Sequence, residues 1–356
     1  MKILLTGAHF TPAQAVMEEL KKIKNVDILY VGRDTTLEGD ITPSIESKII
    51  PTLGIKFIPI TTGRLQMAFT PYTFFSLLRI PVGFIQAFAI ILSEKPDVIL
   101  SFGGYVAFPL VIVGWLFSIP IIVHEQTLVS GLANKASAFF ADKIAFSFKE
   151  NFSIGDKTIL TGNPIRKNVL ESRMQRNPKP PTILIMGGIQ GSHAINVTIE
   201  KCLDKLLKIA RIVHISGDNK FKDFERLEQL GDFGGRYIVQ RWIGEEYGAI
   251  LQKADLVVSR AGINTLTELA YIGKPALVIP IPYLYGDEQN KNAKYFASLG
   301  LVKILPQSKL SANTLLENLK LMLGNLNQLK KKAKNAKEVI IEDASKRLAL
   351  ETILLA

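Results

Sequence analysis

The sequence predicts an α/β fold made of two doubly wound parallel sheets, one in each half of the chain. Strand-like apolar runs alternate with helical stretches from end to end, and the runs are apolar on both faces, as in parallel strands covered by helices. The expected strands of the first half are 2–5, 26–31, 97–101 and 119–124. Those of the second half are 182–186, 211–216, 237–240, 255–258 and 276–279.

The chain of 356 residues is long enough for two domains of ordinary size. We expect domains at 1–166 and 167–356, with the final helix free to return to the first domain, and a proline-rich linker at 177–181. Ligands of doubly wound sheets bind beyond the carboxyl ends of the strands. Two such domains facing each other would therefore hold two ligands across one cleft.

Composition excludes several classes of site. The single cysteine, Cys202, cannot form a disulfide within the chain, and the four histidines do not have metal-ligand spacing. The chain has no DxD triplet, which usually clamps a metal–diphosphate, so we expect no metal and no cofactor. The opening segment 1–7 lacks the basic lead and longer apolar core of a signal peptide.

The net charge of +11 comes mostly from Arg166 onward, with a basic run at 330–334. This charge favours an anionic membrane surface or an anionic substrate, although the run at 330–334 also fits a solvated helix face. Nucleic acid is not expected as a partner, because the aromatic residues do not interleave with the basic ones.

The segment 66–92 is almost uncharged, with Arg79 as its one charged residue. A membrane-spanning helix is disfavoured, because Arg79, Pro81 and Gly83 would fall in its middle. A buried core helix is the ordinary alternative. We favour an interfacial segment that lies on a membrane, with Phe74, Phe75 and Leu78 as contacts, because it holds more apolar residues than one helix normally buries.

The stretch 255–293 carries the strongest sign of a binding site. An apolar strand ends in the turn 259–262, a helical pattern begins near Asn264 and Thr265, and a second strand follows. Free amides at such a helix start bind anions. Glu268 lies one turn in, where a carboxylate can accept hydrogen bonds from a ribose diol, and the polar cluster 289–292 follows at the same edge. The alternative is a capping box in which Thr265 and Glu268 only cap their own helix.

Four more segments lie where strands are expected to end. They are Gly103-Gly104-Tyr105, His124-Glu125-Gln126, the segment 162–166 and the glycine-rich loop 187–192. Each glycine pair alone fits an ordinary tight turn. Their shared position at strand ends favours a common site.

These segments resemble the family 28 glycosyltransferases, which have the GT-B fold. The matching stretches are SFGGYVAFPL, IPIIVHEQTLVSGLANK, TGNPIRKNV, MGGIQGSHAIN, SRAGINTLTELAYIGKPALVIP and DEQNKNA, in the family's order over nearly the whole chain. The resemblance implies inverting transfer of GlcNAc from UDP-GlcNAc to undecaprenyl-pyrophosphoryl-MurNAc-pentapeptide (lipid I), giving lipid II. It implies peptidoglycan synthesis, and with it cell wall biogenesis, cell shape and cell division, on the cytoplasmic face of the bacterial cell membrane as a peripheral protein.

On the donor side, the resemblance assigns a role to each matching position. Arg166 and the loop Gly188, Ile189, Gln190 and Gly191 would hold the diphosphate, and Ile243 would lie beside uracil. The helix start would contact phosphate and sugar through Ile263, Asn264, Thr265, Leu266 and Thr267. Glu268 would bind the ribose hydroxyls, and Gln289, with Glu288 and Asn290 as further candidates, would contact the GlcNAc.

On the acceptor side, the loop of Thr6, Gly7 and Ala8 would cradle the lipid pyrophosphate, and Thr127 would contact the substrate. His9 is the first candidate for the general base that takes the acceptor proton, and Glu125 is the second. The alternative for His9 is a turn residue that orients its loop. The alternative for Glu125 is a structural partner of backbone N–H groups.

The chain departs from the family pattern at three places. The first glycine loop is shortened and so offers fewer backbone N–H groups. Thr127 stands where the family usually has Asn, and Ile189 where it usually has Ser. These departures leave room for a changed acceptor.

Three rival interpretations remain. One is another enzyme of this fold, such as a glycolipid glycosyltransferase or a UDP-GlcNAc 2-epimerase, and the apolar segment 69–92 favours a lipid acceptor over the epimerase. The second is a non-catalytic nucleotide-sugar-binding protein. The third, an NAD-dependent oxidoreductase, is disfavoured because the full GxGxxG motif is absent.

Overall fold

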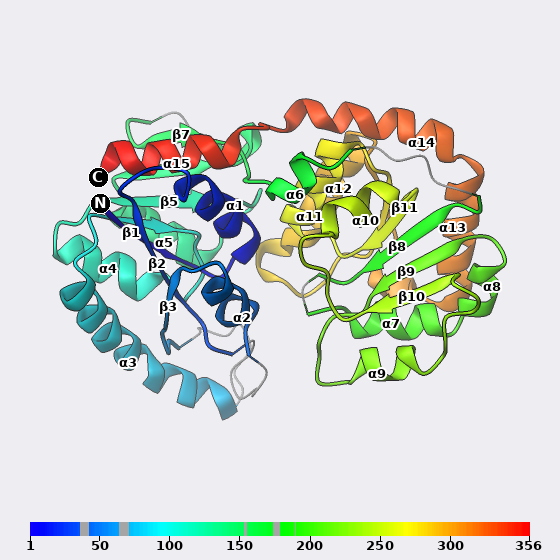
Figure 1. Ribbon diagram of the computed structural model, residues 1–356, viewed down its shortest axis with the longest axis horizontal. Helices are drawn as coiled ribbons and strands as arrows, with labels where there is room; N and C mark the ends of the chain where they lie inside the picture. The colour runs from blue at the N-terminus through cyan, green and yellow to red at the C-terminus, as the bar shows by residue number, and fades with distance from the viewer. Residues whose placement is uncertain (36–42, 64–70, 153–154, 174–178, 189) are drawn as a thin grey trace. The chain divides into compact units, whose positions relative to one another are not determined.

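The computed structural model describes residues 1–35, 43–63, 71–152, 155–173, 179–188 and 190–356, with side chains from residue 78 onward in the helix that begins at Pro71. The chain divides into two compact units. The first consists of Met1–Arg166 and Ile341–Ala356, and the second of Lys167–Ile340. Figure 1 shows the last helix, α15 (Ala344–Leu355), beside α1 (Phe10–Leu20) in the first unit.

The first unit is built on a seven-stranded sheet in the order β3-β2-β1-β4-β5-β6-β7, with every neighbouring pair parallel. Its strands are β1 (Lys2–Thr6), β2 (Asp27–Gly32), β3 (Lys56–Pro59), β4 (Val98–Ser101), β5 (Ile121–Glu125), β6 (Lys143–Phe146) and β7 (Thr158–Leu160). Its other helices are α2 (Ile45–Thr52), α3 (Pro71–Glu94), α4 (Phe108–Leu116) and α5 (Leu132–Phe140), with a 3₁₀ turn at Lys149–Asn151.

Helices cover both faces of this sheet, which explains why its central strands carry apolar residues on both faces. Ile3 and Leu5 of β1 pack in the core that includes residues of α1 and α15. Leu4, between them, points to the opposite face and packs with residues of α3 and α4. Alternate side chains of a strand face opposite sides of the sheet, so a strand covered on both sides reads as one continuous apolar run.

The second unit is built on a six-stranded parallel sheet in the order β10-β9-β8-β11-β12-β13. Its strands are β8 (Thr182–Met186), β9 (Arg211–Ile215), β10 (Tyr237–Gln240), β11 (Leu256–Ser259), β12 (Ala276–Val278) and β13 (Val302–Ile304). Its helices are α6 (Lys167–Leu170), α7 (His193–Glu200), α8 (Leu203–Leu207), α9 (Asp223–Glu228), α10 (Tyr247–Lys253), α11 (Ile263–Ile272), α12 (Glu288–Ser298), α13 (Ala312–Gly324) and α14 (Leu326–Ala333), with 3₁₀ turns at Tyr285–Asp287, Gln307–Lys309 and Lys334–Val339. The prediction of two doubly wound parallel sheets is confirmed.

Four strands were not expected from the sequence: β3, β6, β7 and β13. All lie at or next to a sheet edge. The residues of β3 and β7 are partly exposed, so these strands lack the buried apolar run that identifies a central strand. Sequence pattern therefore identified the middle of each sheet and one edge strand, β10, and missed the other margins.

An aspartate before or at the start of a strand recurs in both units. Asp97 accepts a hydrogen bond from the Lys2 amide at 2.6 Å, and Asp142 accepts one from the Ile121 amide at 2.8 Å. Asp255 does the same for the Thr182 amide at 2.9 Å. Each carboxylate fastens the amino end of its own strand to a neighbouring strand. These hydrogen bonds lie away from the carboxyl ends of the strands, where ligands bind in this fold.

The apolar segment of the first unit forms the long helix α3, which packs against α4. Gly83, Ala87, Ile90 and Ile91 are buried, whereas Leu78, Val82, Ile85, Phe88 and Leu92 are exposed. The described part of α3 is thus not a fully buried core helix, and no helix among the described residues is long and apolar enough to cross a membrane. Phe74 and Phe75 fall outside the described side chains.

Candidate functional site

The turn between β11 and α11 places the backbone amides of a helix start at the carboxyl edge of the second sheet. Helix α11 begins at Ile263 with Gly262 as its N-cap and without a side-chain cap. The amide of Leu266 donates to the Gly262 carbonyl, so the donors of the first turn are the amides of Ile263, Asn264 and Thr265. The capping-box alternative is wrong, because the helix begins before Thr265.

Side chains hold this turn in place. Asn292 of α12 donates to the Ala261 carbonyl at 3.3 Å, and Arg260 donates to the Ile279 carbonyl at 2.9 Å. Gln289 accepts a hydrogen bond from the Ile281 amide at 3.0 Å, which leaves its amide nitrogen as the group for a ligand contact. Glu268 is only 2% exposed, and Leu266 and Thr267 are also buried. We attribute any ligand contact of Leu266 or Thr267 to shape rather than to side-chain hydrogen bonds.

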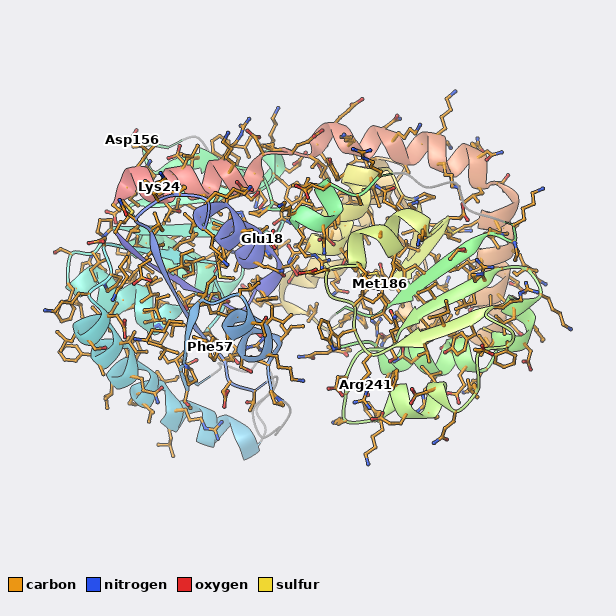
Figure 2. All side chains as sticks on the ribbon, viewed as in Figure 1. Glu18, Lys24, Phe57, Asp156, Met186 and Arg241 are labelled. Atoms are coloured by element: carbon orange, nitrogen blue, oxygen red, sulfur yellow. The ribbon has the colours of Figure 1, made fainter. Side chains whose placement is uncertain are left out.

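The glycine loop after β8 is the second turn at this edge that the sequence predicts to bind an anion. Figure 2 marks Met186, the last residue of β8, directly before the loop. Gly188 has φ +89° and open space where a Cβ would stand, and Gly191 turns back to donate to the Gly188 carbonyl at 3.0 Å. A Cβ on Gly191 would lie 1.7 Å from the Ser216 carbonyl oxygen. Gly188 and Gln190 are exposed, and Ile189 lies outside the described residues.

A buried polar network behind the glycine loop escaped the sequence analysis. Asn196 donates to the Ser216 carbonyl and to Asp223, each at 2.9 Å, and its oxygen lies 3.0 Å from Nε2 of His214. Tyr237 holds the other His214 ring nitrogen at 3.0 Å. Burial lowers the pKa of His214 to about 3, so the ring is neutral at pH 7. The network fixes the Ser216 carbonyl against which Gly191 packs.

Two other predicted donor-side residues are partly buried. Ile243 follows β10, beside Trp242, whose side chain is 54% exposed and whose ring lies 3.2 Å from where a Gly244 Cβ would stand. Arg166 is the last residue of the segment Met1–Arg166, which makes up most of the first unit.

Among the described residues, no group of three or more His, Cys, Asp and Glu could hold a metal ion.

In the first unit, the shortened loop of Thr6, Gly7 and Ala8 interlocks with the loop after β4. Gly7 has φ +142°, and a Cβ there would lie 2.8 Å from the Phe102 carbonyl carbon. Its carbonyl accepts the Tyr30 hydroxyl at 2.9 Å. The Ala8 amide donates to the Gly103 carbonyl at 3.0 Å. This amide is therefore used within the protein and is lost as a donor for a pyrophosphate.

His9 is the N-cap residue of α1, where it makes no side-chain capping hydrogen bond. Its pKa is lowered to about 4, first by burial and then by the positive charge of Arg33. The imidazole is therefore neutral at pH 7 and can accept a proton.

The Glu125 carboxylate is surrounded by hydrogen bonds from its own loop. One oxygen accepts the Thr127 amide at 2.9 Å and the Thr127 hydroxyl at 2.7 Å, and the other accepts the Asn134 side chain at 2.9 Å. Asn134, whose oxygen also accepts the Gly104 amide at 3.3 Å, was not singled out in the sequence. The arrangement fits the structural alternative for Glu125, with Thr127 as a part of the loop.

Comparisons with known proteins cover nearly the whole chain. Residues 6–146 match the glycosyltransferase family 28 N-terminal domain, and residues 182–348 match the glycosyltransferase family 28 C-terminal domain. A protein of Clostridium botulinum (strain Loch Maree / Type A3), named UDP-N-acetylglucosamine--N-acetylmuramyl-(pentapeptide) pyrophosphoryl-undecaprenol N-acetylglucosamine transferase, is 36% identical over 92% of each chain. A protein of the same name from Legionella pneumophila (strain Lens) is 31% identical over 96% of this chain and 93% of its own.

Among solved structures, the chain is similar to the MurG crystal structure from Acinetobacter baumannii. The two share 25% identity and a TM-score of 0.72, with 99% of each chain covered. A UDP-GlcNAc 2-epimerase from Neisseria meningitidis, at 17% identity and a TM-score of 0.64, shares the fold. With both family domains in order and relatives above 30% identity along nine-tenths of their length, this chain belongs to glycosyltransferase family 28.

Proposed function

We propose that this protein transfers GlcNAc from UDP-GlcNAc to undecaprenyl-pyrophosphoryl-MurNAc-pentapeptide (lipid I), with inversion at the sugar, and so makes lipid II for peptidoglycan. The observation that carries the proposal is the similarity to transferases of that name, at 31–36% identity over more than nine-tenths of this chain. The motifs on which the similarity depends are the ones that form the carboxyl edges of the two sheets.

On the donor side, the proposal uses the two amide-rich turns of the second unit. The amides of Ile263, Asn264 and Thr265 and the loop Gly188–Gly191, with Ile189 and Gln190 in it, bind the diphosphate together with Arg166. Negative charge grows on UDP as it leaves, and oriented amides stabilise it without a metal ion. Glu268 binds the ribose hydroxyls, Ile243 packs beside uracil, and Gln289 donates to the GlcNAc.

On the acceptor side, His9 is the general base. Its imidazole is neutral at pH 7, so it can take the proton of the attacking hydroxyl. Glu125 has three hydrogen bonds from Thr127 and Asn134, and we assign it to shaping the loop after β5. The acceptor site is then shaped by Thr6, Gly7, Ala8 and Thr127. None of these residues supplies a positive charge for the pyrophosphate.

The protein is proposed to act as a peripheral protein on the anionic, cytoplasmic face of the cell membrane, where its lipid acceptor lies. The support is an apolar patch on α3, α4 and α5, which pack side by side. The rings of Phe88 and Phe117 lie 5.5 Å apart, and Trp115 and Phe139 each pack edge-on against Phe140, with ring centres 5.2 and 5.4 Å apart. The exposed members of this patch are Leu78, Val82, Ile85, Phe88, Leu92, Trp115, Leu116, Phe117, Leu132 and Phe139.

Basic side chains accompany this patch. Lys135 on α5 and Arg79 on α3 are exposed. Apolar residues that enter the lipid interface beside basic residues that meet acidic headgroups are the usual means by which a peripheral protein binds a membrane. An apolar face of this size on one layer of helices is uncommon on a protein that stays in water.

The direct test is to incubate the full chain with radiolabelled UDP-GlcNAc and lipid I and to separate the products. Label in lipid II supports the proposal, and turnover should persist in EDTA. UDP-ManNAc as the product would identify an epimerase, and label in a different lipid would identify a glycolipid transferase. Binding of UDP-GlcNAc without any product would identify a non-catalytic binding protein.

A further inference from the structure

Arg33 lies at the carboxyl end of β2, next to the shortened loop of the first unit. Strand β2 pairs with β1 so that Val31 stands opposite Thr6, the residue before Gly7. Tyr30, from the same strand, hydrogen-bonds the Gly7 carbonyl at 2.9 Å. Arg33 therefore follows β2 at the sheet edge where β1 leads into His9. None of the motifs that carry the family resemblance contains it.

The Arg33 guanidinium is held from two other elements and remains partly accessible. Its NH2 atom lies 3.3 Å from Oε1 of Glu46 on α2, and the Arg33 side chain is 23% exposed whereas that of Glu46 is 1% exposed. Tyr105, in the loop after β4, hydrogen-bonds it as well. Burial disfavours the charge, but Glu46 and Tyr105 together hold the pKa of Arg33 above its ordinary value. The Arg33 guanidinium thus stays positively charged beside the shortened loop of the first unit.

The positive charge of Arg33 also acts on His9. After burial, it is the second cause of the lowered pKa of His9, so the two side chains share one electrostatic environment. The charge that disfavours a proton on His9 favours an anion at the same place.

The backbone of this region offers few donors for such an anion. The Ala8 amide is used by the Gly103 carbonyl, and the third residue of α1 is Pro12, which has no N–H group. The first turn of α1 contributes the amides of Phe10 and Thr11 at most. A diphosphate bound here needs a cation from a side chain.

We propose that Arg33 binds the diphosphate of the lipid acceptor and supplies the charge that the shortened glycine loop does not. The planar guanidinium can donate two parallel hydrogen bonds to phosphate oxygens while Glu46 and Tyr105 hold its orientation. This inference rests on the proposed function, because it takes the first unit as the acceptor side. It makes Arg33 a binding residue specific to acceptors that carry an anion next to the sugar.

The test compares variants of the full chain. Arg33→Gln should raise the KM for lipid I at least tenfold and leave the KM for UDP-GlcNAc unchanged, and Arg33→Lys should give an intermediate KM. Inorganic pyrophosphate is the binding probe, titrated calorimetrically with saturating UDP so that the donor site is filled. The wild type should bind it, and Arg33→Gln should lose that binding.

Glu46 provides the matched controls, because Arg33→Gln leaves a buried carboxylate without its partner. Glu46→Gln should lower the Tm and weaken pyrophosphate binding much less than Arg33→Gln does, because Tyr105 still holds the guanidinium. The double variant Arg33→Gln/Glu46→Gln should recover much of the Tm lost by Arg33→Gln and still fail to bind. If Arg33→Gln and the double variant keep the wild-type KM for lipid I and bind pyrophosphate, the proposal is overturned and the pair is only structural. Lost pyrophosphate binding in a protein whose wild type makes no lipid II would keep the anion site and reject the proposed function.

Discussion

The carboxyl edges of the two sheets are built from similar glycine-rich turns, but they use their backbone amides differently. In the second unit, Gly188 and Gly262 have open space where a Cβ would stand, and α11 begins without a side-chain cap. In the first unit, a Cβ on Gly7 or Gly104 would lie within 3 Å of a neighbouring loop, and a Cβ on Gly103 would lie within 3 Å of Asn134 on α5. We call the second edge open, because Gly188 and Gly262 are uncrowded although Gly191 packs against Ser216, and we call the first edge interlocked.

This difference suggests a division of labour. An open edge can bind the phosphates of a nucleotide through the oriented amides of its helix start and glycine loop. At an interlocked edge, backbone amides already donate hydrogen bonds to the protein's own residues. Binding and chemistry there therefore depend on side chains. We therefore expect side-chain substitutions to affect binding and reaction of the acceptor more than binding of the donor.

The largest expected effect is that of His9→Ala. Loss of a general base should lower turnover of lipid I by roughly 10²–10⁴-fold and leave UDP-GlcNAc affinity nearly unchanged. Because the pKa of His9 is lowered to about 4, the base is protonated only below that pH, so kcat/KM should rise as pH increases through about 4 and then level off. Steady-state kinetics over pH decide the matter.

A reduction below about tenfold in His9→Ala would reject the base assignment. A parallel loss of UDP-GlcNAc affinity would mean that the donor and acceptor sides are interchanged.

The second effect concerns the open edge. Glu268→Gln keeps the volume of a buried side chain and removes its charge, so UDP-GlcNAc binding should weaken by about 1.5–3 kcal/mol, the cost of losing a charged hydrogen-bond partner. Titration calorimetry measures it. Glu317→Gln, an exposed substitution on α13 of the same unit, should leave binding unchanged. A lower Tm with wild-type affinity would reduce Glu268 to a structural role.

Much of this site was predictable because the signals are local in sequence. The turn after β11 and the glycine loop after β8 each place a buried strand, glycines and a helix start within about ten residues, and the strand ends of a parallel sheet share one edge. What was missed depends on side chains that meet from different elements. Asn134 of α5 meets Glu125 of β5, Arg33 after β2 meets Glu46 of α2, and Asn196 of α7 meets His214 of β9 and Asp223 of α9. No periodicity marks such partners in advance.

A matched pair of substitutions tests the comparison directly. Asn134→Ala leaves Glu125 short of a donor in the first unit, and Asn196→Ala does the same to Asp223 in the second. Each should cost about 1–3 kcal/mol of stability. Asn134→Ala should raise the KM for lipid I several-fold, and Asn196→Ala the KM for UDP-GlcNAc. If both variants change the same KM, the two edges do not serve separate substrates.

The last comparison concerns the surface of the first unit, whose apolar patch has no counterpart of that extent among the exposed apolar residues that the structure describes in the second. Ile85 and Phe139 are 69% and 81% exposed, so replacing both by Ser removes contacts with lipid and very little core packing. Partitioning to anionic vesicles should fall about tenfold, and salt should weaken it further by screening Arg79 and Lys135. Co-sedimentation measures it, with Leu321→Ser on α13 as the control. If the double variant stays on the vesicles while remaining folded, the patch is not the membrane contact, and the basic surface alone would have to hold the protein there. Salt-resistant binding of that variant would exclude the basic surface too.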